Sequence, residues 1–150
     1  MVKITDVKKL REQTQAPVME CRKALIEVKG DFAKAKELLK RWGVEKIETK
    51  KDRVTDQGSV ASYIHTNGKI GALVSLLCET DFVARTDEFK NLAHELAIQI
   101  ASMSPKDADE LLQQPYVRDP KMTVEDLVKQ TAAKLGENVK VRAFARQSIA

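Results

Sequence analysis

The residues of this chain that could do chemistry are few and lie far apart. Cys21 and Cys78 have no CxxC spacing, and neither His65 nor His94 has an HxxxH or Cys/His cluster around it. These spacings argue against a disulfide scaffold and against a metal site. The phosphate-binding patterns GxxxxGK[ST] and GxGxxG are absent, so we expect no direct nucleotide binding and no cofactor.

Two catalytic arrangements stay open at this point. Cys78 and His65 would form a nucleophilic dyad if the fold brought them together, but Cys78 ends an apolar run that is typical of a buried strand. Glu79 and Asp81 are spaced closely enough to act as an acid/base pair, although two carboxylates without a cleft motif are common in loops. We therefore expect no covalent chemistry, with a cysteine enzyme as the last alternative.

The most informative segment is CETDFVAR, residues 78 to 85, between a predicted strand and a predicted capped helix. Rigid elements on both sides leave two interpretations for Phe82. The ring either packs under the strands or is held outward as a binding hot spot, for which a large area with few rotatable bonds is suited. The surrounding residues alone do not favour the second interpretation.

Length and composition limit the kind of fold that can position this segment. The 150 residues, 43% of them hydrophobic and 32% charged, suffice for one compact core or for a small module plus a main domain. The longest apolar run, Ile70 to Cys78, is far short of the roughly 20 residues that cross a bilayer. The charged N-terminus is unlike a signal peptide. We expect a cytoplasmic protein without membrane contact.

The first third of the chain predicts a three-helix bundle, residues 1–43, of the ubiquitin-associated (UBA) type. The first helix, from Thr5 as N-cap to Thr14, precedes a second that begins at Pro17 and ends before Gly30. A third helix is capped by Asp31 and ended by Gly43. Residues 44–57 are mostly charged and predict a linker, and residues 1–53 carry 15 basic and 9 acidic side chains.

Residues 58–150 predict an α+β domain with a small three-stranded antiparallel sheet covered by helices. Strands 59–66 and 69–78 flank Asn67-Gly68, the pair that favours a type I′ hairpin turn. Counting outward from this turn predicts that Tyr63 pairs with Ala72. Long helices are expected after the caps Thr86 and Thr123, and a short one after Ser104-Pro105. The final run predicts the third strand. Strict alternation would turn Arg142, Phe144 and Arg146 outward, which makes Phe144 a candidate partner or dimer contact.

Thr80-Asp81-Phe82-Val83 resembles the TDFV signature of the elongation factor Ts family, the nucleotide exchange factors of elongation factor Tu. The resemblance continues in LREQT at residues 10–14 and in GEN at 136–138, and it covers nearly the whole chain in order. Gln15, Pro17 and Leu77 depart from the family pattern. Longer relatives carry a further helical segment where this chain has only residues 104–113. The resemblance thus implies a minimal version.

The resemblance also implies roles for particular residues. Asp81 and Phe82, within Thr80–Val83, would wedge near the magnesium and phosphate site of elongation factor Tu·GDP and promote GDP release. The N-terminal bundle would hold the partner through four residues, which are Arg11, Val18, Met19 and Lys23. Apart from the resemblance, the outward pattern of the final strand makes Arg142 and Phe144 a possible partner or homodimer surface. The alternatives are an RNA-binding module and a helical adaptor that binds protein without exchange activity.

Overall fold

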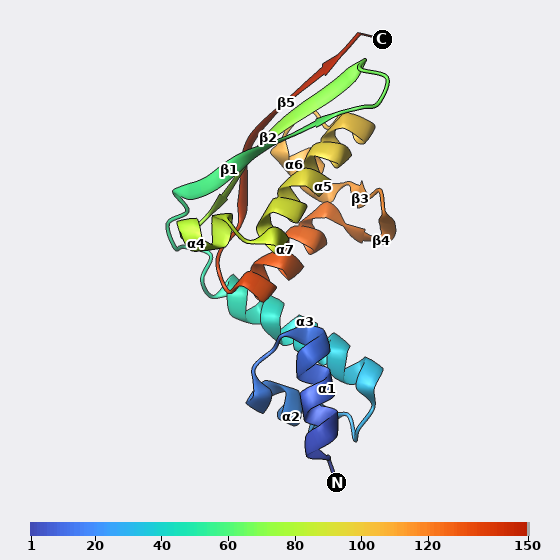
Figure 1. The fold of residues 1–150 in the computed structure, drawn as a ribbon, viewed down its shortest axis with the longest axis vertical. Coiled ribbons are helices and arrows are strands. Elements are labelled where there is room, and N and C mark those ends of the chain that lie inside the picture. Colours follow the sequence, from blue (N-terminus) through green and yellow to red (C-terminus); the bar gives the residue numbers. More distant parts are fainter. Residues whose placement is uncertain (150) are drawn as a thin grey trace.

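The protein is elongated and has two hydrophobic clusters, one in its N-terminal helices and one under its sheet (Figure 1). The structure is a computed structural model that describes residues 1–149. It is mixed helix and sheet, as predicted, with the N-terminal helices followed by a three-stranded antiparallel sheet. Within these residues, no helix is long and apolar enough to span a bilayer.

The N-terminal module consists of α1 (Ile4–Thr14), α2 (Val18–Glu27) and the first part of α3 (Phe32–Glu48). Apolar positions three and four residues apart in each helix converge on one small core. Its buried members are Val7, Leu10, Cys21, Ala24, Leu25, Ala35, Leu38 and Leu39. The thiol of Cys21 is free and fully buried in this core.

The sequence predicted that helix α3 ends at Gly43. In the structure, α3 continues past this glycine for another turn, to Glu48. Ile47 in that turn is buried in the main core, and Lys129 of helix α7 (Val124–Leu135) forms a 2.9 Å ion pair with Glu48. A Cβ atom at Gly43 would lie 3.2 Å from the Cβ of Ala133. The glycine therefore permits close packing of α3 on α7 and does not stop the helix. The first residues of the expected linker belong to this helix.

The sheet has the strand order β1-β2-β5, with β1 (Gln57–Ile64), β2 (Ile70–Cys78) and β5 (Lys140–Ser148) all antiparallel. The predicted pairing of Tyr63 with Ala72 is confirmed. The predicted type I′ turn is wrong. The amide of Gly68 donates to the carbonyl of His65, so Thr66 and Asn67 are the central residues of the turn, and only Gly68 has a positive φ, of 70°. A longer loop keeps the same register.

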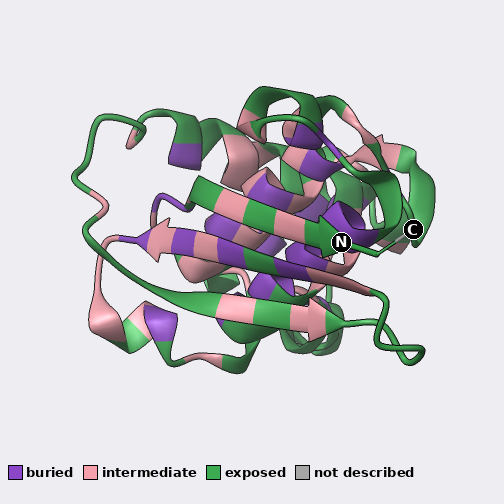
Figure 2. Cartoon of the chain, turned by 90° about the horizontal axis from the view of Figure 1, so that it is seen from above, coloured by how far each residue is buried: buried purple, intermediate pink, exposed green. Residues whose placement is uncertain are grey.

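Helices cover one face of this sheet and leave the other open (Figure 2). Helix α5 (Asp87–Met103) packs against the strands, and α7 (Val124–Leu135) packs on α5. On the covered face of β2, Val74 and Leu76 are fully buried, whereas Leu73 on the open face is 50% exposed. The predicted caps Thr86 and Thr123 are confirmed by side-chain bonds to the amides of Phe89 and Asp126.

Strand β5 departs from the predicted alternation because it contains a β-bulge. Ser75 pairs with Ala143 and Leu76 with Val141, so Arg142 is an extra residue. An extra residue moves every later side chain to the opposite face. Phe144 consequently lies opposite Val74, is half-buried and packs against the main core. The prediction that it faces outward is wrong, and Arg146 also turns inward, donating to the carbonyl of Ala101 at 3.1 Å.

Two other local predictions change in the structure. Lys3, and not Thr5, is the N-cap residue of α1, and Asp107 caps the short helix α6 (Ala108–Gln113) in place of Ser104. Between α6 and α7, β3 (Pro115–Tyr116) and β4 (Asp119–Thr123) form a small hairpin.

That hairpin is fixed to α5 by polar contacts. The hydroxyl of Tyr116 donates to Glu95 at 2.7 Å, and Arg118 donates to the same carboxylate at 2.5 Å. Fully buried Gln99 donates to the carbonyl of Pro115 and accepts from the amide of Val117. Burial, together with the neighbouring carboxylate of Glu95, raises the pKa of Tyr116 to about 12.

Candidate functional site

The candidate site is a single helical turn, α4 (Asp81–Ala84), between the central strand and α5. Thr80 is its N-cap, and the threonine hydroxyl accepts a 3.3 Å hydrogen bond from the amide of Val83. Four residues make few internal hydrogen bonds, so the turn depends on its surroundings. The sequence predicted a tight connection here but not a helical turn.

The four signature residues divide into two that anchor the turn and two that face solvent. Val83 packs against the main core, and Thr80 is half-buried. Phe82 is 77% exposed, and the carboxylate of Asp81 forms a 2.8 Å ion pair with Arg85. The expectation that this ring is presented and not hidden is confirmed. An exposed phenylalanine on an anchored turn has area to bury and little rotational freedom to lose.

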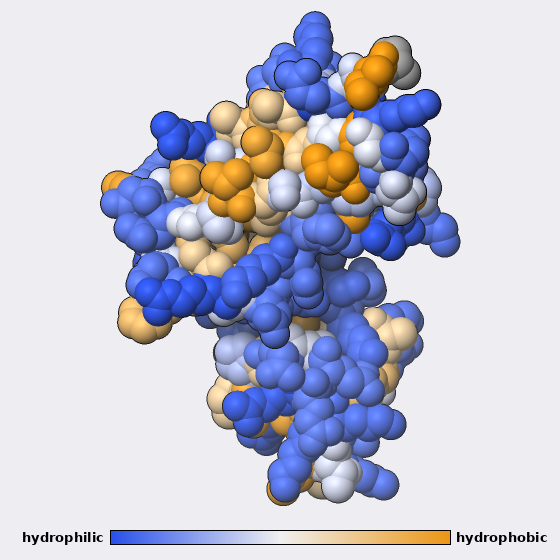
Figure 3. All heavy atoms as spheres, turned by 45° about the horizontal axis from the view of Figure 1, so that its top comes forward, coloured by the Kyte–Doolittle hydropathy of each residue, from blue (hydrophilic) through white to orange (hydrophobic). Residues whose placement is uncertain are grey.

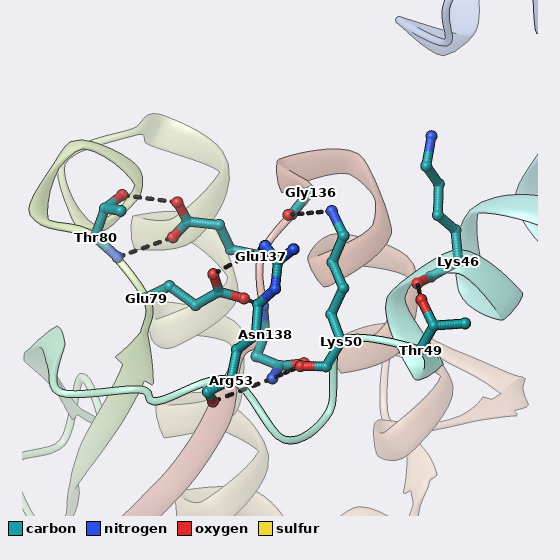
Figure 4. A network of polar contacts seen from close by, with 9 residues as sticks. All are labelled: Lys46, Thr49, Lys50, Arg53, Glu79, Thr80, Gly136, Glu137 and Asn138. Carbon is teal, nitrogen blue, oxygen red and sulfur yellow. Dashed lines mark hydrogen bonds and ion pairs between the residues drawn. The ribbon is translucent and has the colours of Figure 1, made fainter.

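Two carboxylates hold the base of the turn (Figure 4). Glu137 accepts from the amide of Thr80 at 3.0 Å and from its hydroxyl at 2.8 Å. Glu79 accepts from the amide of Asn138 at 2.9 Å and pairs with Arg53 at 3.6 Å. Sequence reasoning identified GEN only as part of a resemblance and missed that its side chains support the turn.

This geometry separates Cys78 from His65 and gives each carboxylate of the other candidate pair its own cation. Cys78 ends strand β2, whereas His65 lies beside the hairpin turn at the other end of the β1-β2 pair. At roughly 3.3 Å per residue along β2, the two residues are about 26 Å apart. Burial, reinforced by the nearby carboxylate of Glu137, raises the pKa of the Cys78 thiol, so the nucleophilic thiolate is disfavoured. Glu79 and Asp81 are engaged by different cations, Arg53 and Arg85.

No group of three or more His, Cys, Asp or Glu side chains suited to a metal occurs among the residues that the structure describes. A hollow of about 550 Å³ lies between the N-terminal module and α7 and away from α4. The α4 turn itself presents one exposed ring, that of Phe82, and one partly exposed carboxylate, that of Asp81.

The predicted residues of the N-terminal module lie on its surface, apart from the α4 turn. Met19 and Val18 are 60% and 46% exposed, and Lys23 lies one turn beyond Met19 on α2. Arg11 is exposed on α1. Ile26, which is 55% exposed, extends the same face of α2. Sequence reasoning missed Ile26, although its spacing of seven from Met19 was a usable signal.

Comparison with known proteins supplies the family. Residues 79–149, which begin just before the α4 turn, match the family model described as Elongation factor TS. Elongation factor Ts of Coprothermobacter proteolyticus is 42% identical, with 95% of each chain covered. This chain belongs to the elongation factor Ts family.

Other members of the elongation factor Ts family agree. The factor of Thermoanaerobacter sp. strain X514 is 39% identical, and the match covers 97% of this chain and 94% of that relative. The factor of Methylacidiphilum infernorum is 41% identical, and the match covers 93% of this chain and 91% of that relative.

Proposed function

We propose that this chain is a guanine nucleotide exchange factor that binds elongation factor Tu·GDP in the cytoplasm and promotes GDP release during translation elongation. Asp81 and Phe82 are inserted near the magnesium and phosphate site of the partner. The observation that supports this most strongly is the exposed ring of Phe82 on an anchored turn, in a chain of the elongation factor Ts family. No covalent step is needed, and the chain itself binds no nucleotide.

Binding and insertion are assigned to different parts of the molecule. The outward face of α2, with Val18, Met19 and Lys23, combines apolar area with positive charge and is suited to hold a partner surface. Arg11 of α1 adds to this charge. The α4 turn lies in the sheet-containing part of the protein, near the middle of its long axis (Figure 1), so the factor would grip its partner with the N-terminal module while Phe82 enters from the sheet-containing part.

Insertion accelerates release only if the factor binds the nucleotide-free partner more tightly than the GDP-bound one. The coupling is reciprocal, so GDP must weaken the factor's own binding by the same ratio. To lower the affinity of elongation factor Tu for GDP a thousandfold, the factor must bind the nucleotide-free form about 4 kcal/mol more tightly than the GDP-bound form. Burying one phenylalanine supplies about 1.5–3 kcal/mol. The rest comes from Asp81, the disturbed metal site and the wider interface.

This reciprocity provides the test. We expect the dissociation constant of the factor to be at least a hundredfold lower for nucleotide-free elongation factor Tu than for the GDP complex, measured by calorimetry with the same preparations. Equal affinities for the two forms would refute an exchange role and leave a protein-binding adaptor. The RNA-binding alternative would need an exposed aromatic ring among the cations of the final strand, but Phe144 lies on the covered face of the sheet.

We also propose a homodimer through the open face of the sheet. The exposed apolar side chains of this face are Val60 and Ile64 of β1 and Leu73 of β2. Because of the bulge, β5 adds Ala143 and Ala145 to this face and not Phe144. Figure 3 shows apolar atoms gathered on the sheet half of the molecule above a largely hydrophilic N-terminal module. A patch of this kind is typical of an interface. Sedimentation that finds only monomer at micromolar concentration would refute the dimer.

A further inference from the structure

The turn between α7 and β5, residues 136–138, touches two separate parts of the protein (Figure 4). On one side lies Thr80, at the start of the α4 turn. On the other side lies the connector, which we define as residues 49–56 between α3 and β1. Glu137 and Asn138 are adjacent in sequence, and each reaches one of these two sides.

Glu137 holds Thr80 with both carboxylate oxygens, at 3.0 Å from the amide and 2.8 Å from the hydroxyl. The Thr80 hydroxyl donates its proton to Glu137, so a lone pair of the Thr80 oxygen is free to accept from the amide of Val83 at 3.3 Å. The carboxylate thus selects the side-chain orientation in which Thr80 caps the turn. Asp81 and Phe82 are the first two residues that this cap positions.

Asn138, only 6% exposed, holds the connector. Its side-chain amide donates to the carbonyls of Lys50 and Arg53. The side chains of the same two residues return the contact, since Lys50 donates to the carbonyl of Gly136 at 3.3 Å and Arg53 pairs with Glu79 at 3.6 Å. The connector begins directly after α3, the helix shared with the N-terminal module.

We propose that Glu137 and Asn138 are positioning residues for nucleotide exchange, Glu137 by orienting the turn that carries Phe82 and Asn138 by tying that turn to the connector and hence to the N-terminal module. This inference rests on the proposed function. A merely structural role would predict that both residues matter only for folding. Positioning predicts separate effects, because Glu137 contacts the inserting turn and Asn138 contacts the segment that leads to the gripping module.

The first experiment uses the isolated protein and does not depend on exchange activity. Amide hydrogen exchange is followed by NMR in the wild type, in Glu137→Ala and in the control Glu45→Ala, which removes an exposed glutamate of α3. We expect the amides of Thr80 and Val83 to exchange at least tenfold faster in Glu137→Ala, while the amides of the central strand β2 keep their protection. Unchanged protection at Thr80 and Val83 would overturn the positioning role.

The second experiment titrates each variant against elongation factor Tu loaded with fluorescent GDP. Glu137→Ala should lower the limiting release rate at least fivefold and leave the half-saturating concentration within twofold of the wild type. Glu137→Gln, which keeps one oxygen acceptor, should recover part of that rate. Asn138→Ala should instead raise the half-saturating concentration at least fivefold and largely keep the limiting rate.

The outcomes separate the two proposals. If Glu137→Ala and Asn138→Ala both behave like Glu45→Ala, or if each variant changes both the limiting rate and the half-saturating concentration, separate positioning is refuted. If the wild type itself does not stimulate release, the proposed function fails, and the exchange role of both residues fails with it. The amide measurement still decides in that case whether Glu137 orders the α4 turn.

Discussion

The substitution Phe82→Ala removes the ring that the proposed mechanism inserts. Full burial of a phenylalanine stabilises a complex by about 1.5–3 kcal/mol. Since 77% of the residue is exposed in the free protein, about 1–2 kcal/mol of this is still available on binding. At 1.4 kcal/mol per factor of ten, the loss corresponds to a release rate lower by roughly tenfold.

The assay is stopped-flow release of fluorescent GDP from elongation factor Tu at a fixed concentration of the factor. Met103→Ala is the matched control, because Met103 is 46% exposed and lies at the other end of α5, about 24 Å from Asp87 at 1.5 Å per residue. The free energy of unfolding should be unchanged in Phe82→Ala, as the ring makes little contact in the monomer. A release rate equal to that of the control would refute insertion of this ring.

Other predictions concern the partner surface, the thiol and the fold. Met19→Ala should raise the half-saturating concentration in the same assay severalfold and change the limiting rate little. A lower limiting rate alone would contradict the assignment of partner binding to the N-terminal module and of insertion to the α4 turn. Cys78 should react with a thiol reagent at pH 8 only after unfolding in urea, because burial raises the pKa of its thiol; rapid labelling of the native protein would contradict its burial. Tyr116→Phe should cost about 1 kcal/mol near pH 8 through the lost bond to Glu95. The native pKa of Tyr116 is raised to about 12, so the stabilising contribution is complete below about pH 10 and is lost as the pH rises toward 12. Urea unfolding of both forms should therefore show a difference that shrinks over this interval, and a constant difference would contradict the assignment. Gly58→Ala should destabilise the protein by more than about 2 kcal/mol, because φ is 154° and the new Cβ would lie 2.0 Å from the carbonyl oxygen of Leu76; near-normal stability in urea would contradict this close approach of β1 to β2.

Local patterns in the sequence predicted much of the fold for physical reasons. Caps such as Asp31, Thr86 and Thr123 act within one helical turn, so residue type and spacing determine them. The register of β1 and β2 followed from the position of Asn67-Gly68 and from alternating burial, even though the turn type was wrong. The exposure of Phe82 was one of two interpretations and became decisive only with the structure.

The features that sequence reasoning missed depend on contacts between distant segments. Nothing near Gly43 reveals that Ala133 of α7 packs against it, so the glycine was taken for a helix end. The bulge at Arg142 arises from pairing with Ser75 and Leu76 and reverses the face of Phe144. Glu137 supports Thr80 across 57 positions of sequence, a relation that no local period contains.

The proposed exchange role requires that this protein accelerate the loss of GDP from elongation factor Tu. The most direct measurement is the release of fluorescent GDP from elongation factor Tu, chased with excess GTP, with and without a substoichiometric amount of the protein. We expect each molecule of the protein to release GDP from many molecules of elongation factor Tu, and Phe82→Ala to slow this turnover about tenfold. A release rate that does not change on adding the wild-type protein would contradict it.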